Sequence, residues 1–375
     1  MPMSEHTTSE ALQHHWALDS QASDVLAERI DVKGLGHVIE DVQAGLDDDA
    51  VEVRDNNRRI VGDIFRGTGK KIIIIGPCSL DVEVDYVPLY DYIDELQEEN
   101  PEAVIALRAN GAKPRTATGW SGLWYGLDPA YRESLFETYQ AAFNRGLPLI
   151  TEITEGNQIG ALGPYLSGVW MGARDIEPTA HRGKFAAYHL PTGVKNGATG
   201  DLGIVENTVK AIRSNSADND NSGVDLGTIA SGPQFAGIPT GIVPVGEGNP
   251  HVAIFTRGYE LPADMPSEEK RAKAFEYISQ TNLLGRKLGS AVVIDGTHSV
   301  PPMFDIDRKS ANRLVPVLEE IHKGIESGEI VEAEELVGVM GEVGIVIGRT
   351  DPNYVLDGPR KEQLRDLINI TVNLL

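Results

Sequence analysis

Four side chains with the chemistry of metal ligands stand far apart in this sequence: Cys78, His298, Glu342 and Asp351. A thiolate, an imidazole and two carboxylates form a mixed set that suits a divalent transition metal such as Mn²⁺, Fe²⁺, Co²⁺ or Zn²⁺. The four do not form a local motif, and a lone buried cysteine more often serves as a small apolar side chain. A metal site therefore requires a fold that brings all four together.

Basic side chains form a second set, suited to an anionic substrate. Lys113 and Arg115 follow closely on an apolar run that ends at Arg108, and Pro114 favours an extended backbone at Lys113. An arginine can hold a phosphate through two hydrogen bonds, whereas a lysine acts as a mobile point charge. The set comprises Arg108, Lys113, Arg115, Arg174, Lys195 and Arg257.

These cations stand against a strongly acidic background, because the 375 residues include 33 Lys and Arg but 56 Asp and Glu, a net charge of −23. Such a charge repels nucleic acids and anionic membranes, so we expect neither as a partner. An anionic substrate would need a local cationic pocket that opposes this field. The structural alternative is that the cations form ion pairs with Glu152 and Glu342.

Eight apolar segments alternate with helical patterns. The first, 71–79, contains four consecutive isoleucines followed by Gly-Pro, which is typical of a buried parallel strand. The others are 103–110, 148–152, 168–174, 191–197, 251–257, 291–298 and 335–342. This alternation predicts a (β/α)8 TIM barrel of the α/β class. A doubly wound sheet is the alternative, but no Gly-x-Gly-x-x-Gly opens a helix after the first strand.

The barrel explains how the two sets would meet. Each candidate residue stands at or just beyond the carboxyl end of a predicted strand, and this end carries the active site in such barrels. Glu152 ends the third strand, and Asp351 lies in the loop after the eighth. We therefore predict a metal and an anionic substrate at one mouth.

The remaining sequence forms extensions of the barrel. We expect an N-terminal tail and extension helix over 1–66, with Val53, Ile60 and Ile64 on one helical face, and the catalytic barrel over 67–375. A Gly- and Pro-rich insertion at about 214–249 reads as a hairpin or loop after the fifth strand. The single cysteine excludes an internal disulfide, and neither a membrane span nor a signal peptide is visible, so we expect a cytoplasmic protein.

Several motifs, taken in order, resemble those of class I 3-deoxy-D-arabino-heptulosonate 7-phosphate (DAHP) synthases, nearest the amino-acid-sensitive bacterial and fungal branch. The matching segments are Gly76-Pro77-Cys78-Ser79, Arg108, Lys113-Pro114-Arg115-Thr116, Gly119-Trp120, Gly172-Ala173-Arg174, His181-Arg182, Lys195-Asn196-Gly197, Arg257-Gly258, Asp295 with His298, Gly338-Val339-Met340 with Glu342, and Thr350-Asp351.

The resemblance implies a metal-dependent condensation of phosphoenolpyruvate (PEP) with erythrose 4-phosphate, the first step of the shikimate pathway to aromatic amino acids. It implies Mn²⁺ or a related ion as cofactor and a homo-oligomer, dimer or tetramer. It assigns the metal to Cys78, His298, Glu342 and Asp351, PEP to Arg108, Lys113, Arg174, Lys195 and Arg257, and the sugar phosphate to Arg115 and Thr116.

The resemblance also implies how the reaction is catalysed. His298 would act through the metal, which polarises or orients the aldehyde. Lys113, or a water on the metal, would protonate the new alkoxide. Glu152 would orient or deprotonate the water that attacks C2 of PEP.

The sequence departs from the family pattern near the second substrate. Ser299-Val300 and Val343-Gly344 stand where the family has Ala-Asn and Ser-His, a Lys-Trp-Gly-His segment is not recognisable in 224–249, and Pro352-Asn353-Tyr354 replaces Ala-Cys-Ile. Two alternatives therefore stay open. One is a diverged paralogue in specialised metabolism that uses a different phosphorylated aldehyde. The other is a catalytically silent regulatory or binding relative.

Overall fold

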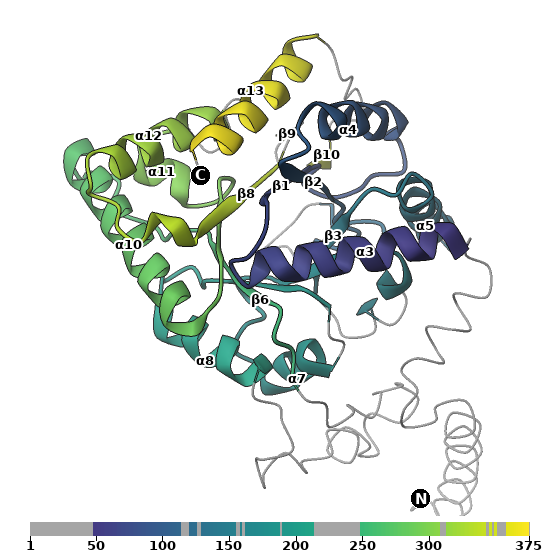
Figure 1. Cartoon of the computed structure of the whole chain (residues 1–375), viewed down its shortest axis with the longest axis horizontal. Coiled ribbons are helices and arrows are strands. Elements are labelled where there is room, and N and C mark those ends of the chain that lie inside the picture. The colour runs from purple at the N-terminus through teal and green to yellow at the C-terminus, as the bar shows by residue number, and fades with distance from the viewer. Residues whose placement is uncertain are drawn as a thin grey trace, which may run out of the picture.

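The chain folds into a closed barrel of eight parallel strands, which run in sequence order around the barrel (Figure 1). The computed structural model describes residues 48–113, 120–125, 129–154, 158–159, 162–187, 190–213, 248–307, 313–342, 345–346, 349–350 and 358–374. The strands are β1 Lys71–Gly76, β2 Ala103–Arg108, β3 Leu149–Ile153, β4 Gly168–Met171, β5 Thr192–Lys195, β6 Val252–Thr256, β7 Val292–Asp295 and β8 Leu336–Glu342. The predicted TIM barrel is confirmed.

Helices surround the barrel and cover its outer face (Figure 1). They are α3 Asp48–Phe65, α4 Val87–Glu99, α5 Pro129–Phe143, α7 Thr179–Ala187, α8 Leu202–Arg213, α10 Ser267–Leu288, α11 Val300–Met303, α12 Leu314–Glu326 and α13 Gly358–Leu374. Short 3₁₀ turns lie at Gly163–Tyr165 and Ala333–Glu335, and β9 Ile345–Val346 pairs with β10 Arg349–Thr350. Of the helices described, none is long and apolar enough to cross a membrane.

The four isoleucines of β1 show why the strand sequences are continuously apolar. Ile72 and Ile74 point into the barrel, where they join an inner cluster with side chains of other strands. Ile73 and Ile75 point outward into the larger cluster between strands and helices. All four are fully buried. Because successive side chains of a strand face opposite ways, a strand that is buried on both faces needs apolar residues throughout.

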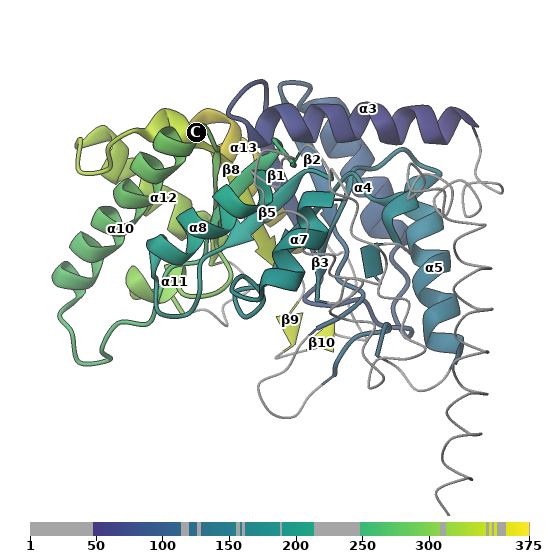
Figure 2. The same cartoon turned by 90° about the horizontal axis from the view of Figure 1, so that it is seen from below.

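Helix α3 closes the N-terminal end of the barrel. Figure 2 shows it along one end, with β9 and β10 at the other. Val61, Ile64 and Phe65 of α3 complete the inner cluster at the N-terminal end of the barrel. The ring of Phe65 meets that of Phe255 edge-on at 5.7 Å between centroids. The predicted extension helix therefore supplies part of the barrel core.

The expected apolar face of this helix is only partly correct. Ile64 is buried and Ile60 packs against the inner cluster, but Val53 is 41% exposed. The first half of α3 extends past the barrel, where Val53 lies over Gly146 rather than in the core. The tail before residue 48 and the segment 214–247, which contains most of the predicted insertion, lie outside the described residues.

Close strand pairing at the C-terminal end of the barrel positions the candidate site residues. Gly76 of β1 lies level with Glu342 of β8, and Cys78 follows two residues later. A Cβ atom at Gly76 would lie 2.1 Å from the carbonyl oxygen of Arg108, so β1 and β2 require glycine here. Because β8, β1 and β2 are neighbours in the barrel, Glu342, Cys78 and Arg108 lie at or just beyond three adjacent strand ends.

The role of α3 can be tested with Ile64→Ala. Removing a fully buried isoleucine from the barrel end should lower the free energy of unfolding by about 2–5 kcal/mol. Urea denaturation followed by circular dichroism measures this change. Glu52→Ala, at an exposed position of the same helix, is the matched control and should change stability by less than about 0.5 kcal/mol. Equal stability of the two variants would show that α3 is dispensable to the barrel.

Candidate active site

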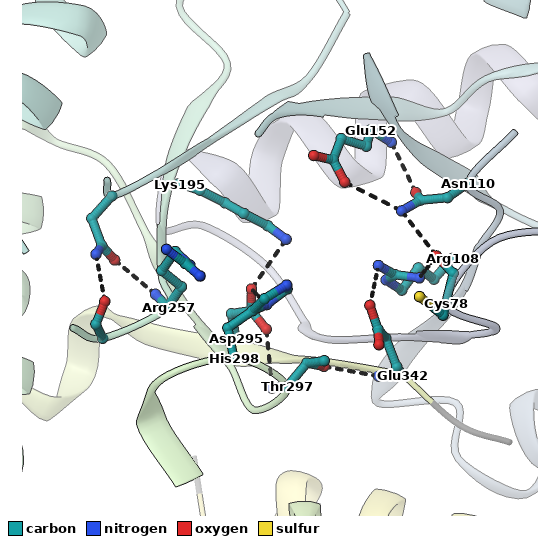
Figure 3. A network of polar contacts seen from close by, with 12 residues as sticks. Cys78, Arg108, Asn110, Glu152, Lys195, Arg257, Asp295, Thr297, His298 and Glu342 are labelled. Carbon is teal, nitrogen blue, oxygen red and sulfur yellow. Dashed lines mark hydrogen bonds and ion pairs between the residues drawn. The ribbon is translucent and has the colours of Figure 1, made fainter. Parts of the chain in front are cut away.

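Arg108, at the end of β2, is the centre of a buried polar network at the C-terminal mouth of the barrel (Figure 3). Its Nη2 atom lies 2.8 Å from Oε1 of Glu342 at the end of β8. Its Nη1 atom donates to the carbonyl oxygens of Pro77 and Cys78 in the loop after β1. Lys113 Nζ reaches the same Glu342 oxygen at 3.4 Å. One arginine thus ties together three strand ends.

Asn110 links this group to β3. Its amide nitrogen donates to Glu152 Oε2 at 3.3 Å, and its side-chain oxygen accepts from the Glu152 backbone N–H at 3.1 Å. Lys113 Nζ lies 3.8 Å from the same Glu152 oxygen. Glu152 is 7% exposed. The general base that the sequence predicts is therefore held in one orientation, beside a cation.

A second group gathers around Asp295 at the end of β7. Lys195 Nζ, from the end of β5, lies 3.0 Å from Asp295 Oδ2, and His298 Nδ1 lies 2.8 Å from the same oxygen. The other oxygen of Asp295 accepts the N–H of Thr297 at 3.0 Å. Thr297 Oγ1 in turn accepts the N–H of Glu342 at 3.0 Å, which connects the two groups. Figure 3 shows both groups side by side.

One aromatic ring lies beneath a cation of each group, Arg108 and Lys195. The indole of Trp170, which pairs in register with Glu152, lies 5.5 Å from Arg108 Cζ and 5.2 Å from Lys195 Nζ. A cation above an aromatic ring in a desolvated site gains electrostatic attraction from the ring. Trp170 stacks in turn on Phe255 at 6.3 Å, so an aromatic column runs from α3 to the site.

The charges set one another's protonation. Burial raises the pKa of Glu342, but Arg108, Lys113 and His298 outweigh burial and hold that pKa well below its usual range. Burial likewise opposes ionisation of Glu152, yet Lys113, Lys195 and Arg108 lower its pKa overall. For Lys113 the desolvation is outweighed by Glu342 and Glu152, which raise its pKa. At neutral pH both carboxylates are ionised and Lys113 is protonated.

His298 has the protonation state that the predicted metal site requires. Burial lowers its pKa, although Asp295 opposes this effect. The hydrogen bond between Nδ1 and ionised Asp295 fixes the tautomer and leaves Nε2 as the ring atom that could bind a metal, an arrangement that metal-binding histidines use. The donor chemistry of His298, Cys78 and Glu342 therefore fits a divalent metal.

The predicted ligands are not gathered into a finished site. Within the part of the chain that the structure describes, no three His, Cys, Asp or Glu side chains are arranged to hold a metal ion. Glu342 is engaged by Arg108 and Lys113, and Asp351 lies outside the described residues. The metal quartet remains a prediction.

Other predicted residues lie around the rim. Arg174 is exposed in the turn after β4, and Arg257 is half-buried after β6, where its backbone N–H donates to Asn196 Oδ1 at 2.8 Å. Arg115 and Thr116 lie outside the described residues. The proposed sugar-phosphate contacts are therefore untested by the geometry.

The structural alternative for the cations also finds support, because the pairs of Arg108 and Lys113 with Glu342, and of Lys113 with Glu152, are present. The two interpretations are compatible. A site built to hold anions must balance its buried cations with internal carboxylates while no substrate is present.

Sequence reasoning missed several residues that organise the site. Asn110 stands two residues after Arg108, and Trp170 nearly ends its strand, which is the signal that could have found them. Asp295 stands among the matching motifs, but the sequence assigned it no role. Arg313 does not stand at a strand end, so its part in the site could not be predicted from its position in the sequence. It is 1% exposed, precedes α12 and donates to the backbone carbonyl of Glu342 at 3.2 Å.

Comparison with known families places this geometry in context. The family model described as the DAHP synthetase I family matches residues 42–360, most of the chain. This range includes the whole barrel down to the first residues of α13.

Individual proteins agree with the family match. The chain is 25% identical over 323 residues to the Tyr-sensitive phospho-2-dehydro-3-deoxyheptonate aldolase of Salmonella typhimurium, covering 82% of this chain and 79% of that protein. It is 24% identical to the tyrosine-inhibited enzyme of Schizosaccharomyces pombe, covering 83% and 80%. A solved phospho-2-dehydro-3-deoxyheptonate aldolase from Francisella tularensis shares the fold, with a TM-score of 0.61 and 19% identity over 89% of this chain and 95% of that one.

The Arg108–Glu342 pair gives a testable electrostatic prediction. Arg108→Met leaves the Glu342 charge buried with Lys113 as its nearest cation, and should lower the free energy of unfolding at pH 7 by about 3–5 kcal/mol. Arg365→Met, which removes an exposed pair with Glu99, is the control and should cost less than about 1 kcal/mol.

The pH dependence of this difference follows from the pKa shift. A lowered carboxyl pKa stabilises the fold above the unfolded value of about 4.3, and this contribution disappears as the pH falls through the folded value. The gap between wild type and Arg108→Met should therefore be widest at neutral pH and should narrow below about pH 4. Urea denaturation across this range measures it, and a pH-independent gap would contradict the proposed pairing.

Proposed function

The chain belongs to the DAHP synthetase I family, and we propose that it condenses PEP with erythrose 4-phosphate to give 3-deoxy-D-arabino-heptulosonate 7-phosphate and phosphate, with a divalent metal. The observation that carries this proposal is the set of buried cations at the barrel mouth. Arg108 and Lys113 come from the end of β2 and the loop after it, and both pair with Glu342. Lys195 comes from the end of β5 and pairs with Asp295. Few substrates require so many desolvated positive charges, and PEP, with a phosphate and a carboxylate, is one that does.

The cations would bind PEP by exchanging partners. Arg108 offers a planar fork suited to phosphate or carboxylate, and Lys195 and Lys113 offer point charges on either side of it. Arg257 and Arg174 would complete the PEP site from the rim. Arg115 and Thr116, in the loop after β2, would take the phosphate of the sugar.

A divalent metal, when bound, would polarise or orient the aldehyde of the second substrate. We assign it to Cys78, His298, Glu342 and Asp351. The hydrogen bond between His298 Nδ1 and Asp295 supports this assignment, because it leaves Nε2 as the ring atom that could bind a metal. Mn²⁺ is the ion that we would supply first.

The residues around PEP are charged in the way the chemistry needs. C3 of PEP attacks the aldehyde carbon, which leaves an alkoxide on the former aldehyde and cationic character at C2. Lys113 is protonated, since the nearby carboxylates raise its pKa, and would donate its proton to the alkoxide. Ionised Glu152 would orient a water for addition at C2 and accept its proton, after which phosphate leaves.

A second candidate reaction is condensation of PEP with a different phosphorylated aldehyde. Two residues that depart from the family pattern, Ser299 and Val300, are buried directly after His298. We place the change on the acceptor side because the residues assigned to PEP are all present in the sequence. A catalytically silent relative is the third possibility, and we propose a homo-oligomer in every case.

The first test is turnover with purified protein. PEP consumption and phosphate release should require both Mn²⁺ and erythrose 4-phosphate, and a chelator should abolish them. PEP binding without turnover would favour the different aldehyde, and a panel of phosphorylated aldoses would then identify it. Neither PEP binding nor metal uptake would favour the silent relative.

Metal binding can be tested separately. Cys78→Ser replaces a soft thiolate by a poor ligand and should reduce both the Mn²⁺ or Zn²⁺ affinity and the turnover rate by about 10- to 100-fold or more. Metal content after dialysis and calorimetric titration measure the affinity. Glu319→Gln, at an exposed position on α12, is the control. Unchanged metal affinity in Cys78→Ser would remove Cys78 from the ligand set.

A further inference from the structure

Asp175, in the turn after β4, is a carboxyl group to which neither the sequence motifs nor the proposed mechanism gives a function. Its Oδ2 atom is shut off from solvent and accepts no hydrogen bond from the residues that the structure describes. The residue as a whole is half-buried, so it also has contact with solvent. A buried carboxylate oxygen without a donor is costly when ionised and favourable when it carries or shares a proton.

The buried oxygen of Asp175 lies close to Glu152. The position of a Cβ atom on Gly172 lies 2.3 Å from Glu152 Oε1 and 2.8 Å from Asp175 Oδ2. The two carboxyl groups therefore both reach the space beside Gly172, which a larger residue would fill. Glu152 uses its other oxygen, Oε2, for Asn110 and Lys113, so Oε1 is the oxygen that faces Asp175. Transfer of a proton between the two needs at most one intervening water.

The electrostatics give such a transfer a direction. Burial raises the pKa of Asp175 to about 6, and Glu152 adds to this effect while Arg174, its neighbour in the same turn, opposes it. Of the described residues, Glu152 on β3 and Arg174 are the charged groups that act on Asp175. The pKa of Glu152 is lowered instead. A proton on Glu152 is therefore more stable after it has moved to Asp175.

We propose that Asp175 is the proton exit of this site, which takes from Glu152 the proton of the attacking water and releases it to bulk solvent. The inference rests on the proposed function, since it continues the step assigned to Glu152. The hydroxide of the water forms the new bond to C2, its proton passes first to Glu152 and then to Asp175, and solvent accepts it. Each carboxylate is restored for the next cycle, and no further reactant is needed.

The first experiment does not depend on turnover. Infrared difference spectra of the free protein, wild type minus Asp175→Asn, should show a carboxylic acid band that titrates near pH 6. In a Glu152→Gln background the same difference band should titrate at lower pH, because the repelling charge has been removed. A band that titrates in the ordinary range of Asp, or that ignores Glu152→Gln, would overturn the proposal.

The second experiment measures the relay itself. Asp175→Asn should lower kcat at least about tenfold at pH 7, leave the KM for PEP unchanged, and recover activity when a small diffusible base such as imidazole is added. Glu177→Gln, an exposed carboxyl two residues away, should leave kcat unchanged. A loss confined to the KM for PEP, without recovery by imidazole, would mean that Asp175 merely positions Arg174.

The two experiments separate this inference from the proposed function. If the wild type does not use erythrose 4-phosphate, the proposed reaction fails, and the infrared titration alone still decides whether Asp175 and Glu152 are coupled. If the wild type turns over and Asp175→Asn matches it in rate and pH profile, the relay is wrong while the reaction stands.

Discussion

Charges that are withdrawn from water must be balanced within the protein, and this requirement governs the mouth of the barrel. Arg108 and Asp295 are fully buried, and Lys195 and Glu342 nearly so. Arg108 and Lys195 each have a carboxylate within ion-pair distance, and Glu342 and Asp295 each have a second partner, Lys113 and His298. The hydrogen bond from the Glu342 N–H to Thr297 connects the two groups across the strand ends. Such a network holds its side chains in fixed positions.

The parallel barrel makes this network possible because the carboxyl ends of all its strands lie at the same end of the barrel. The pairing of Gly76 with Glu342, and of Glu152 with Trp170, sets which side chains become neighbours. In the proposed function, substrate binding would be an exchange of ion-pair partners. An incoming phosphate or carboxylate would take over cations that Glu342 and Asp295 hold in the free protein, and the released carboxylates would become available for other ligands. The same ion pairs would then stabilise the free protein and prepare its binding site.

The sequence predicted the barrel well because strands buried on both faces leave a continuous apolar run, as β1 does. It predicted which residue types stand at the strand ends for the same reason. It did not reveal Asn110, Trp170 or Arg313 as parts of the site, because their roles depend on strand stagger and on contacts between distant segments. Val53 failed as a core residue because helical periodicity shows a face but not how far the helix extends past its partner. The ligand geometry of Asp351, Arg115 and Thr116 lies outside the described residues.

The aromatic column of Phe65, Phe255 and Trp170 has a further consequence for access to the barrel interior. Among the described residues, helix α3 and these rings occupy the barrel interior from its N-terminal end up to the charged layer. In the proposed function, both substrates would therefore reach the charged residues from the C-terminal mouth. We would then expect ordered binding, because the substrate that binds first lies deepest and leaves last.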